Sequence, residues 1–448
     1  MRKIITALIA IIALTLPVKA DSIEKVLSKQ HINIGAVSIS VKDADTGEKI
    51  YSLNDRTPRQ PASTLKIITT AASLNTLGFD YKFSTRLYKS TKDDLYIKLG
   101  ADPFLKSSDL KTLIATAKSK NIEPKNIYID STIFDNVEWG EGWQWDDDLN
   151  PYMPKFSAYN LDENLINIEI TPKQNGTAPN VTVKPFYPVT IMNLVITDYN
   201  EKNNIKLERN NSISPNIINA KGVISKQTVI KIPVNNPQLY FNLRLQETIK
   251  NRKFNYYNPI KVGKLPDKGV YLADEITNDI DRAITECLKN SNNMVAETLF
   301  KLAGAKFTNE QGNIYNSQKM LDKFFEDLNL NIEDIRITDG SGVSKNNIIT
   351  TDFMTDFLIK YSKTENFDRI KEYLPTPGEG TLKNRMLYFK GNMRAKTGTL
   401  SNTSAITGYI TTRRGKNYVF SIIIQDAKTT EKDKKNIEEL ILREIYII

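Results

Sequence analysis

Residues 61–78 read PASTLKIITTAASLNTLG, and this stretch is the most informative part of the sequence for both fold and chemistry. Pro61 at its start and Gly78 at its end are typical of helix boundaries, and the apolar residues between them recur with helical spacing. Ser63 and Lys66 are three residues apart and therefore share one helix face, where an amine can take a proton from a hydroxyl. Burial at the mouth of so apolar a helix lowers the pKa of a lysine. The same spacing occurs at Ser22 and Ser108, and a polar pair on a solvated helix face is the alternative for each. Only at Ser63 does a strongly apolar helix favour a serine nucleophile with a neutral lysine beside it.

One cysteine and one histidine among 448 residues exclude several kinds of active site. Cys287 alone cannot form an intrachain disulfide, and Cys287 and His31 together cannot build a zinc site of His and Cys ligands. A Ser-His-Asp hydrolase would need His31 as its base, and a lone histidine is more often structural. We therefore expect the proton carriers of an enzyme with this composition to be Lys, Tyr, Asp or Glu.

The first 20 residues, MRKIITALIAIIALTLPVKA, have the basic start, the short apolar run and the small residues that export signals share. The run is shorter than the about 20 residues that a membrane span needs. We expect cleavage after Ala20, and a buried N-terminal helix is the alternative. The net charge of +9 is dispersed and forms no basic arm for nucleic acid. The sequence predicts an exported protein with no nucleic-acid partner and at most peripheral membrane contact.

The rest of the chain divides into segments that differ in the spacing of their apolar residues. Residues 35–54 predict a hairpin, and the end of the chain predicts a strand, a hairpin and a helix. From residue 83 to 236, short alternating segments predict a mostly β insertion, in which the Asn-rich stretch 200–216 is expected to be an exposed loop or a small mobile excursion. Helical patterning returns at 237 and again from 276.

Two further tripeptides carry polar groups suited to acyl transfer. Lys396-Thr397-Gly398 follows a strand-like segment, where a glycine lets a substrate backbone approach while the lysine and threonine face an anionic group. Ser291-Asn292-Asn293 lies between two helical stretches and offers a hydroxyl to relay a proton and an amide to hold a peptide bond. Each tripeptide alone is compatible with an ordinary turn, so the indication lies in their combination with Ser-x-x-Lys.

In that order, Ser-x-x-Lys, Ser-x-Asn and Lys-Thr-Gly form the motif set of penicillin-binding proteins and serine β-lactamases. The chain resembles class C low-molecular-mass penicillin-binding proteins, D-alanyl-D-alanine carboxypeptidases/endopeptidases, over nearly its whole mature length. Further matching segments are Gly100-Ala101-Asp102-Pro103, residues 142–147, Asp339-Gly340-Ser341-Gly342, and Gly380-Thr381-Leu382 with Arg385.

The resemblance implies an α/β (α+β) serine DD-peptidase or β-lactamase-like fold. An antiparallel sheet flanked by helices would be joined to a helical subdomain and to a large β-rich inserted region. The transpeptidase-like domain would occupy residues 21–82 and 237–448, with the insertion at 83–236.

The same resemblance implies a role for each motif residue. Ser63 would attack the carbonyl of the D-Ala-D-Ala bond and form an acyl-enzyme, with Lys66 as its general base. Ser291, influenced by Lys396, would relay a proton to the leaving amine, and Asn293 would bind the substrate backbone. The other implied contacts are those of Lys396 and Thr397 with the terminal carboxylate, beside Gly398, and an oxyanion hole formed by the N–H groups of Ser63 and Thr399.

Two residues outside the motifs would recognise the side chain of the stem peptide. In the family an aspartate of the insertion binds the free amino group of the diamino acid, and its place after Gly-Trp-x-Trp implies Asp147, with Asp146 as the alternative. Lys345 would face the side-chain carboxylate, but the family usually has arginine at that position. Lysine keeps the charge and lacks the planar fork of arginine.

The sequence thus predicts a periplasmic serine-type D-Ala-D-Ala carboxypeptidase and endopeptidase that acts on peptidoglycan stem peptides. β-Lactam antibiotics would be its covalent inhibitors, and no metal or organic cofactor would be needed. The alternatives are a serine β-lactamase and a catalytically silent wall-binding protein. The large insertion and the lack of a separate carboxylate-base motif favour the peptidase, and the complete motif set favours an enzyme.

Several conspicuous residues have less specific interpretations. Cys287 is expected to be a small buried apolar residue. Trp139, Trp143 and Trp145 could form a platform for sugars or pack within the insertion. The C-terminal residues 437–448, IEELILREIYII, could anchor the chain at a membrane surface, and packing against the sheet is favoured.

Overall fold

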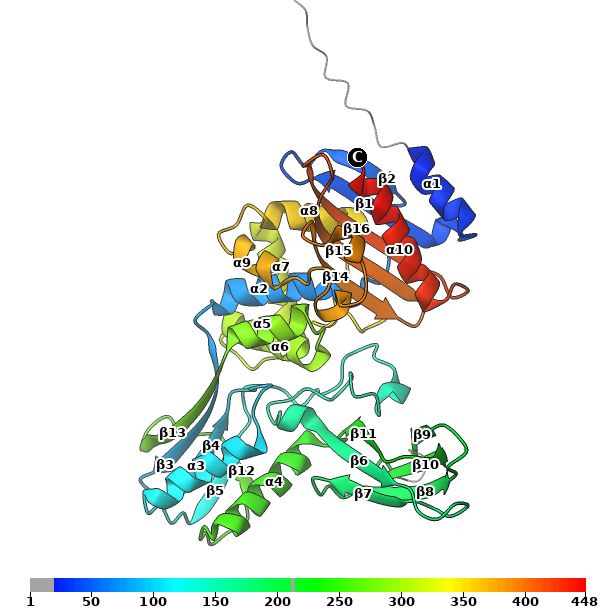
Figure 1. Cartoon of the computed structure of the whole chain (residues 1–448). Helices are drawn as coiled ribbons and strands as arrows, with labels where there is room; N and C mark the ends of the chain where they lie inside the picture. Colours follow the sequence, from blue (N-terminus) through cyan, green and yellow to red (C-terminus); the bar gives the residue numbers. More distant parts are fainter. Residues whose placement is uncertain (1–19, 211–213) are drawn as a thin grey trace, which may run out of the picture.

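The computed structural model of the chain describes residues 20–210 and 214–448 (Figure 1). Residues 1–19 of the predicted export signal lie outside the described residues. The molecule has an upper part, with one sheet and most of the helices, and a lower part with three further sheets (Figure 1). Within the described ranges, no helix is long and apolar enough to cross a membrane.

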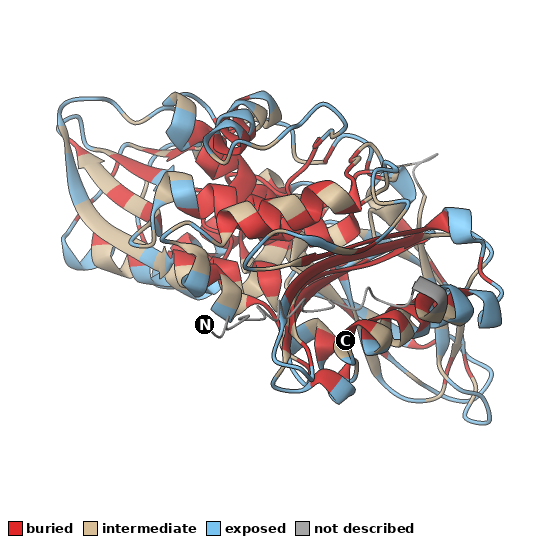
Figure 2. Ribbon diagram, turned by 90° about the horizontal axis from the view of Figure 1, so that it is seen from above, coloured by how far each residue is buried: buried red, intermediate tan, exposed pale blue. Residues whose placement is uncertain are grey.

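A five-stranded antiparallel sheet in the upper part joins the two ends of the chain. Its order is β14-β15-β16-β1-β2, and β1 pairs with β16 from Val37↔Ile424 to Asp43↔Tyr418. Its central strands are buried on both faces, as Figure 2 shows, so helices must cover both sides. The strands are β1 (Val37–Asp43), β2 (Lys49–Leu53), β14 (Met393–Leu400), β15 (Thr403–Thr411) and β16 (Asn417–Gln425).

One face of this sheet is covered by the two terminal helices, α1 (Ala20–Lys29) and α10 (Glu431–Tyr446). Ile437, Ile441 and Leu442 of α10 are buried in one apolar cluster with residues of β1 and β16. The C-terminal segment therefore packs against the sheet, as the sequence analysis favoured.

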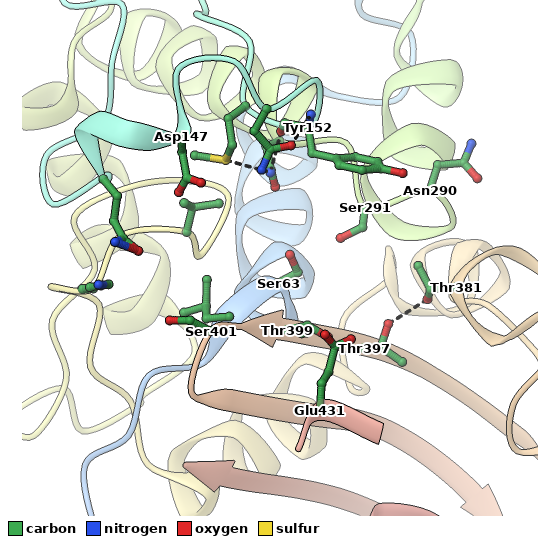
Figure 3. A pocket seen from close by; sticks show the side chains of 18 residues that line it. Ser63, Asp147, Tyr152, Asn290, Ser291, Thr381, Thr397, Thr399, Ser401 and Glu431 are labelled. Carbon is green, nitrogen blue, oxygen red and sulfur yellow. Dashed lines mark hydrogen bonds between the residues drawn. The ribbon is translucent and has the colours of Figure 1, made fainter. Parts of the chain in front are cut away.

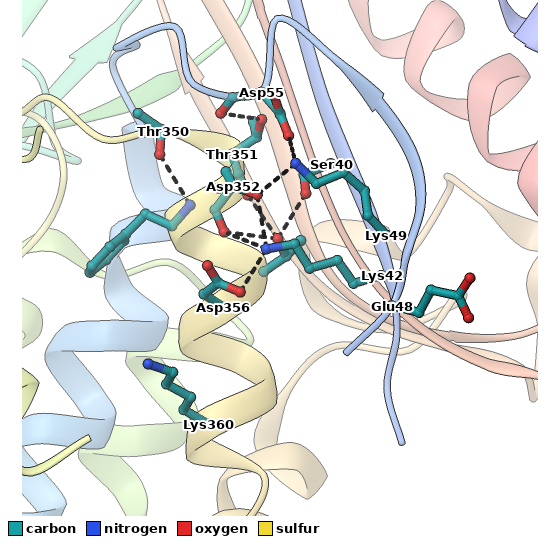
Figure 4. Close-up of polar contacts among 12 residues, drawn as sticks. Ser40, Lys42, Glu48, Lys49, Asp55, Thr350, Thr351, Asp352, Asp356 and Lys360 are labelled. Carbon is teal, nitrogen blue, oxygen red and sulfur yellow. Dashed lines mark hydrogen bonds and ion pairs between the residues drawn. The ribbon is translucent and has the colours of Figure 1, made fainter. Parts of the chain in front are cut away.

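The opposite face is covered by α8 (Thr351–Tyr361), which meets the polar side chains of β1 (Figure 4). The hydroxyl oxygens of Ser40 and Thr355 are 2.8 Å apart. The Lys42 ammonium lies 2.8 Å from a carboxylate oxygen of Asp352 and 2.6 Å from one of Asp356. Alternation along β1 thus directs its apolar side chains toward α10 and its polar ones toward α8.

The helical subdomain surrounds α2 (Lys66–Leu77), which packs against three other helices. Every residue of α2 from Lys66 to Leu74 is buried, as is typical of a helix at the centre of a core. The surrounding helices are α5 (Ile280–Leu288), α6 (Asn293–Thr308), α7 (Ile314–Asp327) and, at the edge, α9 (Phe367–Tyr373). This arrangement buries the lysine of Ser-x-x-Lys beneath the sheet edge.

A second five-stranded sheet, in the order β12-β5-β4-β3-β13, begins the insertion. Its strands are β3 (Lys82–Ser90), β4 (Asp94–Leu99), β5 (Asn126–Asp130), β12 (Lys261–Val262) and β13 (Val270–Asp279), and α3 (Ser107–Ser119) packs against β13 and against α4 (Pro237–Arg252). β13 pairs with β3 as far as Asp279↔Lys82. The sheet therefore contains residues on both sides of position 236, and we propose residue 279 as the end of the insertion.

Two three-stranded sheets complete the insertion, in the orders β11-β6-β7 and β8-β10-β9. Their strands are β6 (Leu165–Thr171), β7 (Asn180–Lys184), β8 (Thr190–Thr197), β9 (Asn204–Arg209), β10 (Ile217–Ile224) and β11 (Thr228–Pro233). The prediction of a loop at 200–216 is wrong for β9, which pairs antiparallel with β10. The prediction of a helix from residue 276 is wrong by four positions, because β13 continues to Asp279.

Candidate active site

The three motifs converge where β14 passes the turn that carries Ser63 (Figure 3). Ser63 lies in the 3-10 helix η2 (Ala62–Leu65), directly before α2. A side chain at Gly398 of β14 would place its Cβ 2.8 Å from the Ser63 backbone nitrogen and 2.8 Å from the Ala62 Cβ. The glycine of Lys-Thr-Gly is therefore required for this close approach of strand and turn.

Lys66 is fully buried and donates hydrogen bonds to three oxygens. Its Nζ lies 2.9 Å from Ser63 Oγ, 2.6 Å from Asn293 Oδ1 and 2.7 Å from the Ser341 carbonyl oxygen. Burial lowers the pKa of Lys66 to about 8, against the opposing influence of Cys287, Asp339 and Glu297. A substantial fraction of this amine is therefore neutral near pH 8, in contact with the serine hydroxyl.

A second buried amine lies at the other serine of the motif set. Lys396 of β14 donates to Ser291 Oγ at 2.9 Å and to the Thr397 carbonyl oxygen at 2.9 Å. Burial and the charge of Lys66 lower the pKa of Lys396 well below its ordinary value. Ser291 has φ +60°, which is rare outside glycine and is found at positions that the surrounding fold holds in place.

Asn293 connects the lysine to the insertion. It is the first residue of α6, and the side chain of Asn292 caps this helix by accepting from the Val295 N–H at 3.1 Å. The Asn293 Oδ1 accepts from Lys66, and its Nδ2 donates to the Tyr152 carbonyl oxygen at 2.8 Å. The middle motif thus places a carboxamide between the catalytic helix and an inserted loop.

The carbonyl that Lys66 contacts belongs to a loop held by two buried carboxylates. The sequence analysis named Asp339 only as part of a matching segment, without a role, and it missed Glu297. Asp339 accepts from the Trp143 indole N–H at 2.8 Å and from the Ser344 N–H at 2.7 Å. Glu297 of α6 accepts from the Gly340 N–H at 3.0 Å and from the Ser341 N–H at 2.8 Å. Burial and the neighbouring Asp339 raise the pKa of Glu297, and the N–H groups of Gly340 and Ser341 oppose that shift.

A cavity of about 510 Å³ opens above the two serines, and it brings together most of the predicted site residues. Lys66 and Lys396 are buried behind its wall, where they hydrogen-bond Ser63 and Ser291. The predicted residues that line it are Ser63, Asp147, Ser291, Asn293, Lys345, Thr397, Gly398 and Thr399. Figure 3 shows Ser63 and Ser291 facing the same space, with Thr397 and Thr399 along β14.

The far end of the cavity carries the predicted charged pair. Asp147 and the exposed Lys345 both line it, whereas Asp146 does not. Burial and the adjacent Asp146 raise the pKa of Asp147, while Lys345 acts in the opposite direction. Lining residues that sequence analysis missed include Tyr152, Ser401 and Glu431. Gln144 and Thr381 also line the cavity and lie in the matching segments, but they were given no role.

The tryptophans of the inserted loop divide into two kinds. Trp143 is buried against Phe156. The Trp139 ring contacts the Trp143 ring edge to face at a centroid distance of 5.0 Å, so Trp139 and Trp143 pack within the protein. Trp145 is 77% exposed.

Cys287 is fully buried, and burial raises the pKa of its thiol to about 12. In the described part of the chain, no group of three or more His, Cys, Asp or Glu side chains is placed to hold a metal ion.

Known proteins share both the sequence pattern and the fold. A model of the D-Ala-D-Ala carboxypeptidase 3 (S13) family matches residues 19–443. The D-alanyl-D-alanine carboxypeptidase of Actinomadura sp. is 26% identical over 422 residues, which cover 87% of this chain and 78% of that protein. The D-alanyl-D-alanine carboxypeptidase DacB of Haemophilus influenzae is 23% identical over 425 residues, which cover 90% and 87%.

The crystal structure of penicillin binding protein 4 (dacB) from Haemophilus influenzae matches with a TM-score of 0.82 and 22% identity. The match covers 95% of this chain and 99% of that chain, and it confirms the predicted fold class. Family model and fold agree over nearly the whole length, and the chain therefore belongs to the D-Ala-D-Ala carboxypeptidase 3 (S13) family.

Proposed function

We propose that this protein hydrolyses the D-Ala-D-Ala bond of peptidoglycan stem peptides through an acyl-enzyme on Ser63. The observation that carries the proposal is the set of contacts of Lys66, whose Nζ lies 2.9 Å from Ser63 Oγ and 2.6 Å from Asn293 Oδ1. A buried amine of lowered pKa beside a half-exposed hydroxyl is the arrangement that activates a serine without a histidine.

Substrate binding sets the charge states of the two lysines in this proposal. The terminal carboxylate of the substrate contacts Thr397 at the edge of β14, and its charge acts on the buried Lys396 behind the cavity wall. The negative charge of the carboxylate favours the protonated form of Lys396. Two neighbouring buried amines do not both hold a proton easily. Lys66 is then left neutral, as a general base requires.

Acylation follows from these charge states. Lys66 takes the hydroxyl proton of Ser63 as the oxygen attacks the peptide carbonyl, and the N–H groups of Ser63 and Thr399 stabilise the oxyanion. When the C–N bond breaks, Ser291 gives its proton to the leaving amine and regains one from Lys396. Water then enters in place of the amine, and its oxygen attacks the acyl carbon while its proton passes through Ser291 to Lys396. The ester bond to Ser63 breaks as Lys66 returns its proton to Ser63 Oγ, which releases the product acid.

The charged pair at the far end of the cavity supports a zwitterionic side chain in the substrate. Asp147 would accept from the ammonium of a diamino acid, and Lys345 would pair with its carboxylate. The same chemistry cleaves a peptide cross-link when the leaving amine belongs to a neighbouring diamino acid, so we propose endopeptidase as well as carboxypeptidase activity.

β-Lactams are the proposed covalent inhibitors of the same serine. Penicillin binding protein 4 of Haemophilus influenzae has been solved in complex with a β-lactam, and it shares the fold of this chain. We propose that the ring-opened drug remains on Ser63. The alternative function is that of a serine β-lactamase, which would release the ring-opened drug from the serine quickly.

Labelling with a fluorescent penicillin tests the proposal. We expect covalent labelling of the wild-type protein and none of Ser63→Ala. Ser108→Ala is the matched control, because Ser108 has the same Ser-x-x-Lys spacing in α3, outside the cavity. We expect this variant to be labelled like the wild type. Labelled Ser63→Ala protein would contradict the nucleophile, and rapid turnover of penicillin would favour the β-lactamase.

Purified peptidoglycan fragments give the second readout. We expect release of D-alanine from pentapeptides and splitting of cross-linked dimers, both measured by mass and both absent from Ser63→Ala. Export is tested by the N-terminal sequence of the protein recovered outside the cytoplasm, which we expect to begin at Asp21.

A further inference from the structure

A second cavity, of about 380 Å³, lies beside the catalytic one. The two cavities share the loop around the 3-10 helix η3 (Trp145–Asp147). Gln144, Asp147 and Asn150 line the catalytic cavity, whereas Trp145 and Asp148 line the second. The Asp147 N–H donates to the Gln144 carbonyl oxygen at 3.3 Å and the Asn150 N–H to the Asp147 carbonyl oxygen at 3.0 Å. These two successive three-residue turns place positions 144, 147 and 150 on one side and positions 145 and 148 on the next. The turn thus presents one face to each cavity.

The second cavity combines an exposed aromatic ring with fixed polar groups. Trp145 is 77% exposed, although its large apolar surface favours burial. Trp139, the other indole in the lining, is held by its edge-to-face contact with the buried Trp143. Asp148 and Arg209 form an ion pair at 2.6 Å, and the Arg209 side chain is only 4% exposed. Trp139, Asp148 and Arg209 are therefore held in place before any ligand arrives.

This lining matches the chemistry of a sugar ring. A pyranose has an apolar C–H face that packs on an indole, and hydroxyls that bond in the plane of carboxylate, guanidinium and amide groups. A purely apolar ligand would leave the ion pair of Asp148 and Arg209 without compensation on desolvation. A nucleic acid would need cations free for its phosphates, and the cations here are paired, Arg209 with Asp148 and Lys155 with Glu138 at 3.4 Å.

We propose that this cavity binds a pyranose ring of the glycan strand to which the stem peptide is attached. The inference rests on the proposed peptidoglycan activity and extends it from the peptide to the sugar. One enzyme turn would then hold the two parts of one substrate, with the diamino acid on the Asp147 face and the sugar on the Trp145 face. An extended peptide spans about 3.3–3.6 Å per residue, so three residues cover about 10 Å, which is about the width of one helical element with its side chains.

Two substrates that differ only in the sugar provide the test. For the wild-type protein we expect kcat/KM about tenfold higher on a disaccharide-pentapeptide than on the free pentapeptide, which corresponds to about 1.4 kcal/mol. The difference should lie in KM, because the sugar is far from the reacting bond and is bound equally in ground and transition states. In Trp145→Ala the ratio should fall to about one, and in Trp145→Phe most of it should remain.

Tyr257→Ala is the matched control, since Tyr257 is an aromatic residue with 74% exposure that lines neither cavity. In this variant, the ratio of kcat/KM on the disaccharide-pentapeptide to kcat/KM on the free pentapeptide should equal that of the wild type. A wild-type ratio of one, or an unchanged ratio in Trp145→Ala, would overturn the sugar site while D-alanine release continues. Failure to release D-alanine from either substrate would instead overturn the proposed function.

Direct binding keeps the inference testable even without turnover. Titration of Ser63→Ala with the disaccharide alone should change the tryptophan fluorescence, and the change should be smaller in Ser63→Ala combined with Trp145→Phe. A fluorescence signal that never saturates, or one that is the same in both proteins, would count against a site at Trp145.

Discussion

At the scale of single residues, the site depends on groups whose surroundings change their ordinary chemistry. Lys66 is predictable from sequence, because Ser-x-x-Lys fixes its distance from Ser63 within one helix turn. Glu297 is not predictable in this way. It stands in an apolar helix, and only the fold brings the Gly340 and Ser341 N–H groups onto its carboxylate. Tyr152 likewise enters the site through a loop contact that no local pattern encodes.

The lowered pKa of Lys66 predicts the pH dependence of acylation. If the neutral amine is the base, kcat/KM should rise with pH and level off above about 8, the pKa to which burial lowers Lys66. The sign follows because protonation removes the lone pair that accepts the Ser63 proton. Penicillin acylation rates measured across this range check the prediction. If the acylation rate instead rose with an apparent pKa in the range of carboxylic acids, the base would be a carboxylate.

Replacement of Glu297 by Gln tests whether this carboxylate positions Lys66. Glutamine presents an amide N–H to one of the loop N–H groups, so we expect at least about a tenfold loss of kcat from an unsatisfied buried donor. The negative charge of Glu297 raises the pKa of Lys66, so its removal should also move the ascending limb to lower pH. Asp339, Lys301 and Cys287 are the other titratable groups in electrostatic contact with Glu297.

Glu123→Gln serves as the control, because Glu123 is exposed and lies in the insertion. Its pH profile should match the wild type. A Glu297→Gln protein that loses stability but keeps the wild-type limb and kcat would show that Glu297 only supports the fold.

At the scale of elements, strands were predictable where their alternation was strong and their partners were close in sequence. The hairpin of β15 and β16 is an example. β9 was missed because its Asn-rich surroundings favour a loop, and its strand character comes from pairing with β10. The end of β13 was missed because residues 276–279 continue the helical spacing of α5, whereas their backbone pairs with β3. Tertiary pairing decided both cases.

The contact between β1 and α8 predicts acid-sensitive stability. Although burial raises the pKa of Asp352, its hydrogen bond and charge contacts with Lys42 and Lys49 lower it overall. A carboxylate with a depressed pKa stabilises the folded state above its unfolded pKa, and this contribution is lost as pH falls through the folded pKa. We expect Lys42→Met to lower the free energy of unfolding by about 1–3 kcal/mol at neutral pH, and by less in acid.

Urea unfolding at a series of pH values provides the measurement. Lys206→Met is the control, because Lys206 pairs with Glu208 on the surface, where its side chain is 76% exposed. Loss of that exposed pair should leave the free energy of unfolding close to the wild-type value. A Lys42→Met protein with wild-type stability at every pH would contradict the proposed role of the pair.

At the scale of the whole molecule, the insertion contributes directly to the catalytic cavity. The upper part supplies Ser63 and Thr397, while the insertion supplies Asp147 and Tyr152. The motif set indicated the convergence of the upper part in advance, because its order and residue types are specific. The contribution of the insertion could be inferred only through the family resemblance, since nothing in its β-rich pattern points toward Ser63.

The division of the cavity predicts how Asp147→Ala affects different substrates. We expect kcat/KM to fall about tenfold or more on a stem peptide with a free diamino-acid amine, because a charged hydrogen bond is lost. On a simple acyl-D-Ala-D-Ala the loss should be small, since that substrate does not reach Asp147. Asp146→Ala should leave both values near the wild type. Equal losses on both substrates would remove Asp147 from the recognition of the side chain.

The carboxamide of Asn293 has a consequence for drug response. One end of this group orients the amine of Lys66, and the other end is tethered to the backbone of Tyr152 in the insertion. Reactivity toward a small antibiotic is thereby linked to a loop in a different part of the molecule. We expect resistance substitutions to arise in residues 150–154, where a relaxed backbone would slow acylation even by compounds that never contact it.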